Sequence, residues 1–150
     1  MLFSFFVVAA VGLGQALASP TELVDRAQPE IVSCYNVGTK SDRTPFVAAI
    51  DQWAAEIIEN PPLANRKVIG TTLHDGQEVS TVFEFGAVDY WLSAKAINGC
   101  SFTIDSNCNR LLRLPVDQCN TSGENGKQGG VMTDPCGQWT ADPGANGNPF

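Results

Sequence analysis

Four of the five cysteines lie between Cys100 and Cys136, and this spacing limits what the chain can fold into. In an oxidising compartment, closely spaced cysteines in a short chain form structural disulfides. Five candidates leave one thiol over, and five choices of that residue times three pairings give 15 arrangements, all of which the sequence leaves open. The disulfide candidates are Cys34, Cys100, Cys108, Cys119 and Cys136.

The N-terminal residues indicate export. Residues 2–13 are almost continuously apolar, and Ala16-Leu17-Ala18 forms a small-x-small cleavage motif. This pattern predicts a signal peptide over residues 1–18. A membrane-spanning helix needs about 18 or more apolar residues, and Gly12 and Gly14 interrupt the run before that length is reached. We therefore expect a secreted, extracellular protein with no membrane insertion.

The charge balance bears on the choice of partner. The chain has 9 Lys and Arg against 16 Asp and Glu, a net charge of −7. An acidic protein is repelled by nucleic-acid phosphates and by anionic membranes, so no nucleic-acid partner is expected.

Motifs for metals, cofactors and nucleophilic catalysis are incomplete. No C-x2-C pair suggests a zinc site, and His74 is the only histidine that a catalytic thiol could use. Asp105, Asn107 and Asn109 begin like a calcium loop, but Arg110 stands where that loop requires glycine. We expect no metal, no cofactor and no enzymatic activity.

Two helices are predicted. The first has Thr44 as N-cap and Pro45 at the first helical position, and apolar residues recur at helical spacing up to Asn60. The second covers residues 107–119, where Pro115 predicts a kink or a division into two short pieces.

Strand patterns occupy much of the remaining chain. Residues 67–73, 79–85 and 90–97 predict three strands joined by turns at residues 74–77 and 86–89. A fourth strand is predicted over residues 131–141, with a turn or edge irregularity at Asp134-Pro135.

These elements predict an α+β fold: an antiparallel sheet of about four strands packed with two helices and stabilised by disulfides. The predicted domain covers residues 34–142, after an extended leader at 19–33 and before a flexible tail at 143–150.

Candidate binding residues follow from strand alternation. Tyr90 and Trp91 are adjacent and must point to opposite faces of a sheet, so one of them is expected outside the core. An exposed aromatic ring with a polar edge suits stacking on a sugar or contact with a protein. Glu84, Asp89 and the loop residue Asn125 are the expected polar groups of such a site.

One glycosylation motif is present. Asn120-Thr121-Ser122 is the sole N-x-[ST] sequon, on a predicted loop of an exported chain. Asn120 is therefore a candidate for N-glycosylation, with a structural polar turn as the alternative.

Three segments carry a family resemblance: residues 34–39 (CYNVGT), 99–103 (GCSFT) and 116–130 (VDQCNTSGENGKQGG). With the intervening helix they resemble small secreted fungal glycan-binding proteins, which are lectin-like single domains. The resemblance implies an α+β domain with disulfides, carbohydrate binding without catalysis, and a homodimer. One departure is the absence of a cysteine expected near Trp53, whose would-be partner would then be the odd thiol.

The leading functional hypothesis is a secreted, non-catalytic carbohydrate-binding protein whose partners are glycans or glycoproteins. The alternative is a secreted effector or toxin that acts by binding a protein. A small glycoside hydrolase that uses Glu84 or Asp89 is the weaker alternative, because it needs two carboxyl groups about 5–9.5 Å apart across a cleft.

Overall fold

The computed structural model describes residues 29–55 and 68–145. These ranges contain two helices and seven strands. They are β1 (Ile31–Cys34), α1 (Arg43–Trp53), β2 (Thr72–Leu73), β3 (Glu78–Phe85), β4 (Val88–Ala96), β5 (Phe102–Thr103), α2 (Cys108–Gln118), β6 (Gly130–Thr133) and β7 (Gly137–Ala145). Neither helix has the length and hydrophobicity needed to cross a bilayer.

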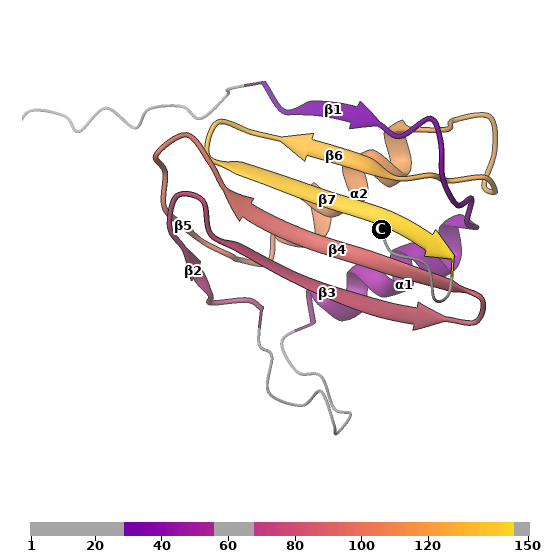
Figure 1. Cartoon of the computed structure of the whole chain (residues 1–150), viewed down its shortest axis with the longest axis horizontal. Helices are drawn as coiled ribbons and strands as arrows, with labels where there is room; N and C mark the ends of the chain where they lie inside the picture. The colour runs from indigo at the N-terminus through magenta and orange to yellow at the C-terminus, as the bar shows by residue number, and fades with distance from the viewer. Residues whose placement is uncertain (1–28, 56–67, 146–150) are drawn as a thin grey trace, which may run out of the picture.

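The main sheet has five antiparallel strands in the order β1-β6-β7-β4-β3, and both helices pack on one of its faces (Figure 1). Strands β2 and β5 form a separate two-stranded sheet. The predicted α+β class is therefore confirmed, with one strand more in the main sheet than expected.

The β3–β4 hairpin shows why one face of the sheet is core. Phe83 lies opposite Tyr90, and Thr81 lies opposite Leu92. Alternate side chains of a strand share one face of the sheet, so Tyr90 and Leu92 lie on the same face. The helices cover this face, and both side chains are fully buried. The residues between them point to the other side of the sheet.

Helix α1 closes the core with Phe46, Ile50 and Trp53, all buried. It begins at Arg43, with Asp42 rather than Thr44 at the N-cap position, so the predicted cap was misplaced. Helical structure ends at Trp53 and does not continue through residues 54 and 55; the rest of the predicted helix lies outside the described residues. Helix α2 is continuous through Pro115, so of the two predicted alternatives the division is wrong, and the kink stays a prediction.

The prediction of one strand over residues 131–141 is also wrong. The chain reverses at Asp134–Cys136, and β6 and β7 pair with each other as an antiparallel hairpin. The Asp134 carboxylate accepts hydrogen bonds from the backbone N–H groups of Cys136 and Gly137, at 2.9 and 2.6 Å. The turn alternative was therefore the right one, and it yields two strands.

The predicted three-stranded meander is wrong in its first strand. The turn at residues 74–77 forms, with the Gln77 N–H donating to the His74 carbonyl at 2.8 Å. Strand β2, however, has only two residues and pairs with β5 instead of β3. The fifth strand of the main sheet is β1, which comes mostly from the predicted leader and pairs with β6.

The last strand extends beyond the C-terminal boundary that was predicted for the domain. Strand β7 continues to Ala145, into the segment predicted as a tail. The predicted signal peptide lies outside the described residues.

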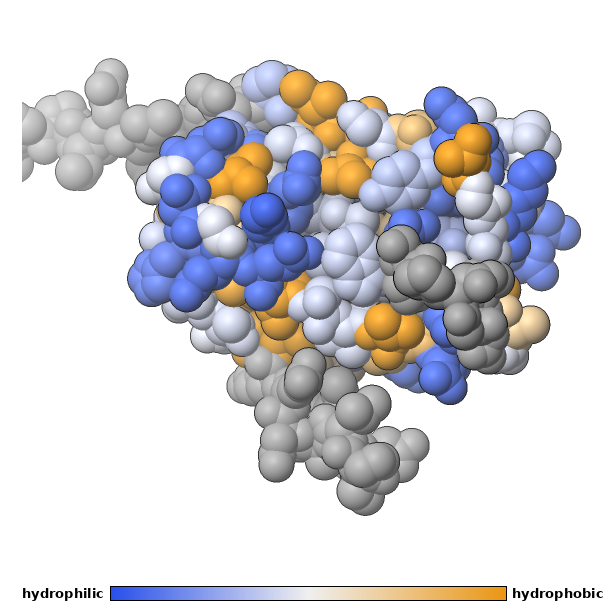
Figure 2. Space-filling view, in the orientation of Figure 1, coloured by the Kyte–Doolittle hydropathy of each residue, from blue (hydrophilic) through white to orange (hydrophobic). Residues whose placement is uncertain are grey.

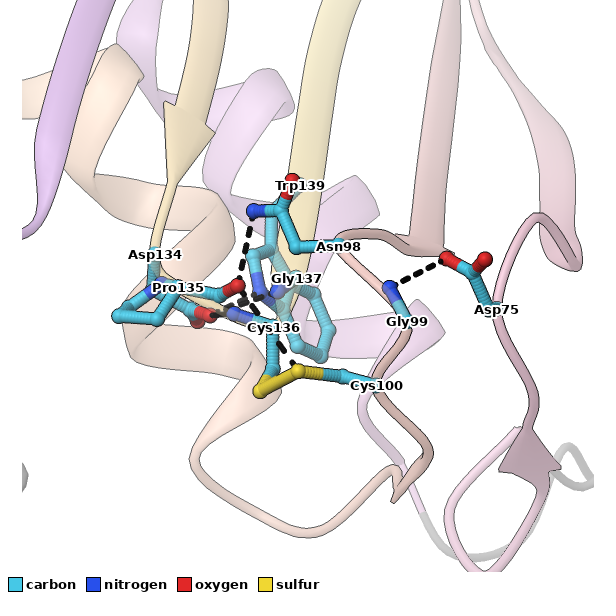
Figure 3. Close-up of a disulfide and its surroundings, with 9 residues drawn as sticks. All are labelled: Asp75, Asn98, Gly99, Cys100, Asp134, Pro135, Cys136, Gly137 and Trp139. Atoms are coloured by element: carbon cyan, nitrogen blue, oxygen red, sulfur yellow. Dashed lines mark hydrogen bonds between the residues drawn. A yellow bond between two sulfur atoms is a disulfide. The ribbon is translucent and has the colours of Figure 1, made fainter.

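Two disulfides stabilise the fold. Cys34 bonds to Cys119. Cys100 bonds to Cys136, and Figure 3 shows this second bond. All five cysteines lie in the described part of the chain, and Cys108 of α2 is the one without a partner. Two disulfides are typical of chains that fold in an oxidising compartment, which agrees with export.

The Cys108 thiol is expected to be unreactive in the folded protein. It is fully buried, and burial raises its pKa to about 11, so at neutral pH it carries its proton and is not a nucleophile. At about pH 8 the native protein should give no reaction with a thiol reagent, and one equivalent of thiol after denaturation without reductant. A native reaction, or more than one thiol after denaturation, would contradict this disulfide arrangement.

Candidate functional site

The sheet face opposite the helices, called here the open face, carries the alternate residues of its strands. Figure 2 views the molecule from this side and shows polar and hydrophobic residues interleaved. Its residues on the three strands β3, β4 and β7 are Glu78, Ser80, Val82, Glu84, Asp89, Trp91, Ser93, Lys95, Gln138, Thr140 and Asp142. Four of the five charged residues among them are acidic.

The structure brings together three of the five predicted binding residues. Trp91 is half-buried on the open face, and Glu84 lies directly opposite Asp89 in the β3–β4 ladder. Cross-strand neighbours in an antiparallel ladder have Cβ atoms about 4.5–5.5 Å apart. The two carboxylates and the indole therefore occupy neighbouring positions of one surface.

Tyr90 belongs to the core. Its ring is fully buried, with its centroid 4.9 Å from that of Phe46, and its hydroxyl shares a hydrogen bond with the Ser41 hydroxyl. The choice between Tyr90 and Trp91 thus falls on Trp91, and Tyr90 is withdrawn as a ligand-binding residue.

Asn125 lies apart from the strands, in the loop between α2 and β6. It is exposed, and its loop is held beside the start of α1, where the Arg43 N–H donates to the Glu124 carbonyl at 2.9 Å. Lys127 and Ser41 pair across the same junction. Asn125 therefore belongs to this junction and not to the ladder positions of the open face.

Two further residues extend the candidate site in a row across the strands. Asp142 of β7 lies opposite Trp91, and Tyr35 donates its backbone N–H to Gly129, the residue before β6. Burial raises the pKa of the Asp142 carboxyl, and burial together with the Asp142 charge raises the pKa of the Tyr35 phenol. Sequence alternation gave no signal that Asp142 would lie opposite Trp91.

Asp89 has an unusual environment for a carboxylate. Its side chain is only 8% exposed, and its Oδ1 atom is buried without a hydrogen-bond partner in the part of the chain described. Buried polar groups are almost always hydrogen-bonded, because an unpaired one loses its water without compensation.

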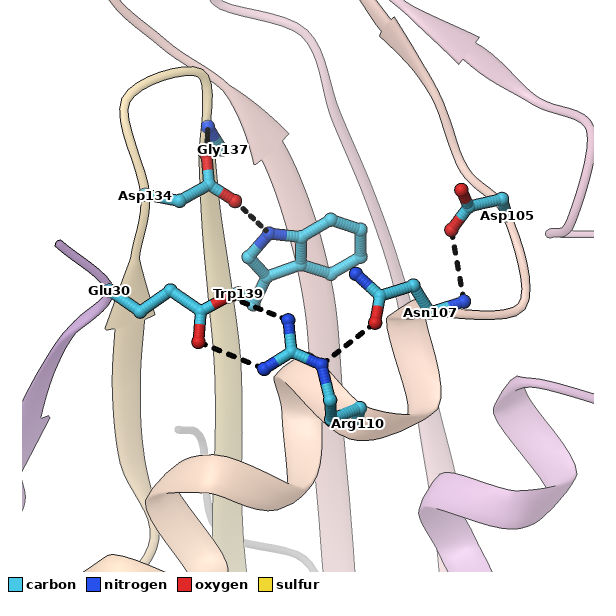
Figure 4. Close-up of polar contacts among 7 residues, drawn as sticks. All are labelled: Glu30, Asp105, Asn107, Arg110, Asp134, Gly137 and Trp139. Carbon is cyan, nitrogen blue, oxygen red and sulfur yellow. Dashed lines mark hydrogen bonds and ion pairs between the residues drawn. The ribbon is translucent and has the colours of Figure 1, made fainter. Parts of the chain in front are cut away.

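A separate pocket of about 140 Å³ opens at the β5 end of the molecule. Its residues are Phe102, Thr103, Asp105, Asn107, Leu111, Asp134, Cys136 and Trp139. Several of them are fixed by the polar contacts in Figure 4. Its walls come from segments that only the fold brings together.

Two further predictions concern metal binding and N-glycosylation. Residues 29–55 and 68–145 contain no group of three or more His, Cys, Asp or Glu side chains arranged to hold a metal ion. The Asn120 amide exchanges hydrogen bonds with Gln128, donating to Oε1 at 3.3 Å and accepting from the backbone N–H at 3.0 Å. A glycan on Asn120 would disrupt this pair, and its modification stays a prediction.

Comparison of the sequence with protein-family models and with curated proteins gives no match.

Proposed function

We propose that this is a secreted, non-catalytic glycan-binding protein that uses the open face, with Trp91 at the centre of its site. The observation that supports this most is the placement of Trp91 between Val82 and Asp142, next to the Glu84–Asp89 pair. The resemblance of the cysteine-rich segments to fungal glycan-binding proteins supports the same function.

The chemistry of these groups suits a sugar. An indole offers a flat apolar surface for the C–H groups of a pyranose ring, and a carboxylate accepts hydrogen bonds from its hydroxyls. A hydrogen bond to a charged group contributes about 1.5–3 kcal/mol, and the exposed Glu84 carboxylate offers its oxygens for one. The ligand would be held by stacking and hydrogen bonds, with no cofactor.

Binding on an open sheet face would be weak for a single site. Linking two sites raises the overall affinity, because the second contact forms at a high effective concentration. A homodimer, which the family resemblance implies, belongs to this proposal as the source of avidity.

Substitution of Trp91 tests the proposal. On a glycan array with the mature protein, W91A should lower binding about tenfold, because an aromatic stacking contact of about 1.4 kcal/mol is lost. W91F keeps a ring and should retain most of the binding. E124Q, on the exposed loop after α2, is the matched surface control.

Two outcomes would contradict the proposal. The first is a wild-type array signal no higher than that of denatured protein. The second is unchanged binding by a folded W91A protein, with folding checked by its thermal unfolding.

One observation favours a protein ligand instead. Ile31 and Val82 on the open face are 58% and 42% exposed and offer apolar surface that a protein partner could cover. An effector or toxin of this kind would bind deglycosylated partner extracts saturably and would not be inhibited by sugars.

The hydrolase alternative requires turnover on a polysaccharide that disappears in E84A or D89A.

A further inference from the structure

We propose that the pocket between β5, the start of α2 and the β6–β7 turn is a second binding site, which takes one sugar ring bearing a protonated amino group. This inference adds to the proposed function, because it gives the molecule a charged-sugar site away from the open face. It also names a ligand class that the open face alone does not specify.

The size of the pocket limits the ligand to one ring. At about 140 Å³ it is well below the roughly 300–1,000 Å³ of pockets that enclose drug-sized molecules. Leu111 and Trp139 are 5% and 4% exposed and provide an apolar base. Phe102 is half-buried, and its ring centroid lies 5.5 Å from that of Trp139. The C–H face of a pyranose fits such a surface.

The polar groups at the rim are held in fixed positions. Asp105 accepts the Asn107 backbone N–H through Oδ1 at 2.9 Å, which leaves Oδ2 as an acceptor for a ligand. The Asn107 side chain accepts from Arg110 Nε through its own Oδ1 at 2.8 Å, so its amide N–H groups are the donor on this side. The rim thus offers one carboxylate oxygen from Asp105 and one amide donor from Asn107 (Figure 4).

The opposite wall adds a second carboxylate. The Oδ2 atom of Asp134 accepts from Trp139 Nε1 at 3.3 Å, while its Oδ1 atom is taken by the turn. Of the two, Oδ2 has the longer hydrogen bond and retains acceptor capacity for a ligand.

The net charge at the pocket selects the amino group. Arg110 is the nearby cation, but both of its terminal nitrogens bind Glu30, at 2.9 and 2.6 Å. Asp105 and Asp134 therefore leave the pocket negative, with more acceptors than donors. An ammonium group carries three donors and a positive charge, and matches this arrangement better than a neutral hydroxyl.

The disulfide holds the wall in place. Cys136 lines the pocket and bonds to Cys100, and Asn98 donates to the Pro135 carbonyl at 2.9 Å (Figure 3). Gly99 is attached in turn to Asp75 at 3.0 Å. A site whose walls are already fixed loses little conformational entropy when a ligand enters.

The test titrates the intact mature protein with glucosamine and with N-acetylglucosamine, following amide chemical shifts by NMR. Glucosamine should bind in the millimolar range and shift the signals of Thr103 and Asn107, and N-acetylglucosamine should bind at least tenfold more weakly. D105N keeps the shape and the Oδ1 acceptor but removes the charge, and should weaken glucosamine binding about tenfold. E124Q should leave it unchanged.

The outcomes separate this proposal from the glycan site on the open face. W91A should lower the array signal about tenfold and keep glucosamine binding in the pocket. Equal binding of the two sugars, no effect of a folded D105N protein, or shifts confined to the open face would each overturn the pocket proposal. The third probe is Nα-acetyl-lysine N-methylamide, which keeps the charged ε-ammonium group. If it bound as strongly as glucosamine, the sugar assignment would be overturned in favour of a lysine side chain.

Discussion

Replacing Cys34 and Cys119 together with serine is expected to lower the free energy of unfolding by about 4 kcal/mol. The bond joins residues 85 apart in the sequence, and a crosslink over so long a loop removes much of the entropy of the unfolded chain. It also attaches the edge strand β1 to the residue that follows α2. Domains of this size have only about 5–15 kcal/mol in total, so much of the stability is at stake. Urea unfolding followed by tryptophan fluorescence measures it.

The second disulfide is the matched comparison. Cys100 and Cys136 are 36 residues apart, and the same entropy relation gives a loss smaller by about 0.8 kcal/mol when both are replaced with serine. If this pair proved as costly as the first or more so, contacts around each bond, and not chain entropy, would govern the effect.

Gly129→Ala is expected to destabilise the fold by about 2–5 kcal/mol. Gly129 has φ +71°, a left-handed conformation that costs a residue with a Cβ about 1–2 kcal/mol. The new Cβ would overlap the Ala141 carbonyl oxygen of β7 and lie 3.2 Å from the Phe46 ring. Because the first obstacle is backbone, no side-chain rotation relieves it, and the start of β6 must shift. Denaturant unfolding checks the loss.

Gly126→Ala separates the two causes. Gly126 has φ +84°, but a Cβ there would meet nothing within 4 Å, so only the conformational cost of about 1–2 kcal/mol applies. A loss at Gly129 no larger than that at Gly126 would show that β6 and β7 move apart without penalty.

Local patterns predicted the hairpin and the second helix well, because their information lies within about ten residues. The predicted strand over residues 79–85 agrees with β3, whereas Asp89 was assigned to the turn and belongs to β4, where it lies opposite Glu84. The turn between β3 and β4 lies at residues 86–87, within the predicted turn at residues 86–89. For these elements, the sequence periodicity and the burial in the fold agree.

Long-range pairing was beyond sequence reasoning. Strand β1 has only four residues, and its partner β6 comes about 100 residues later, so no local signal could identify it as part of the sheet. Alternation also carries no information about which strand pairs with which. That is why β2 was assigned to the main sheet, and why Asp142 was missed beside Trp91.

The pocket shows the same limitation in the functional site. Its walls come from β5, the start of α2 and the β6–β7 turn, which the sequence predicted only as a turn or edge irregularity within one strand. Asp105 and Asn107 were noted only as an incomplete calcium loop. Their role as rim groups depends on Trp139, which the β6–β7 hairpin carries to the same place.

The burial of Cys108 in α2 has a consequence for how the chain matures. Before α2 packs, any of the five thiols can form a crosslink. Once the helix is packed, the Cys108 thiol is buried and no longer accessible to oxidation. The remaining four cysteines then have three possible pairings instead of 15. Oxidation that follows helix docking should therefore reach the native crosslinks with fewer scrambled intermediates than oxidation of the unfolded chain.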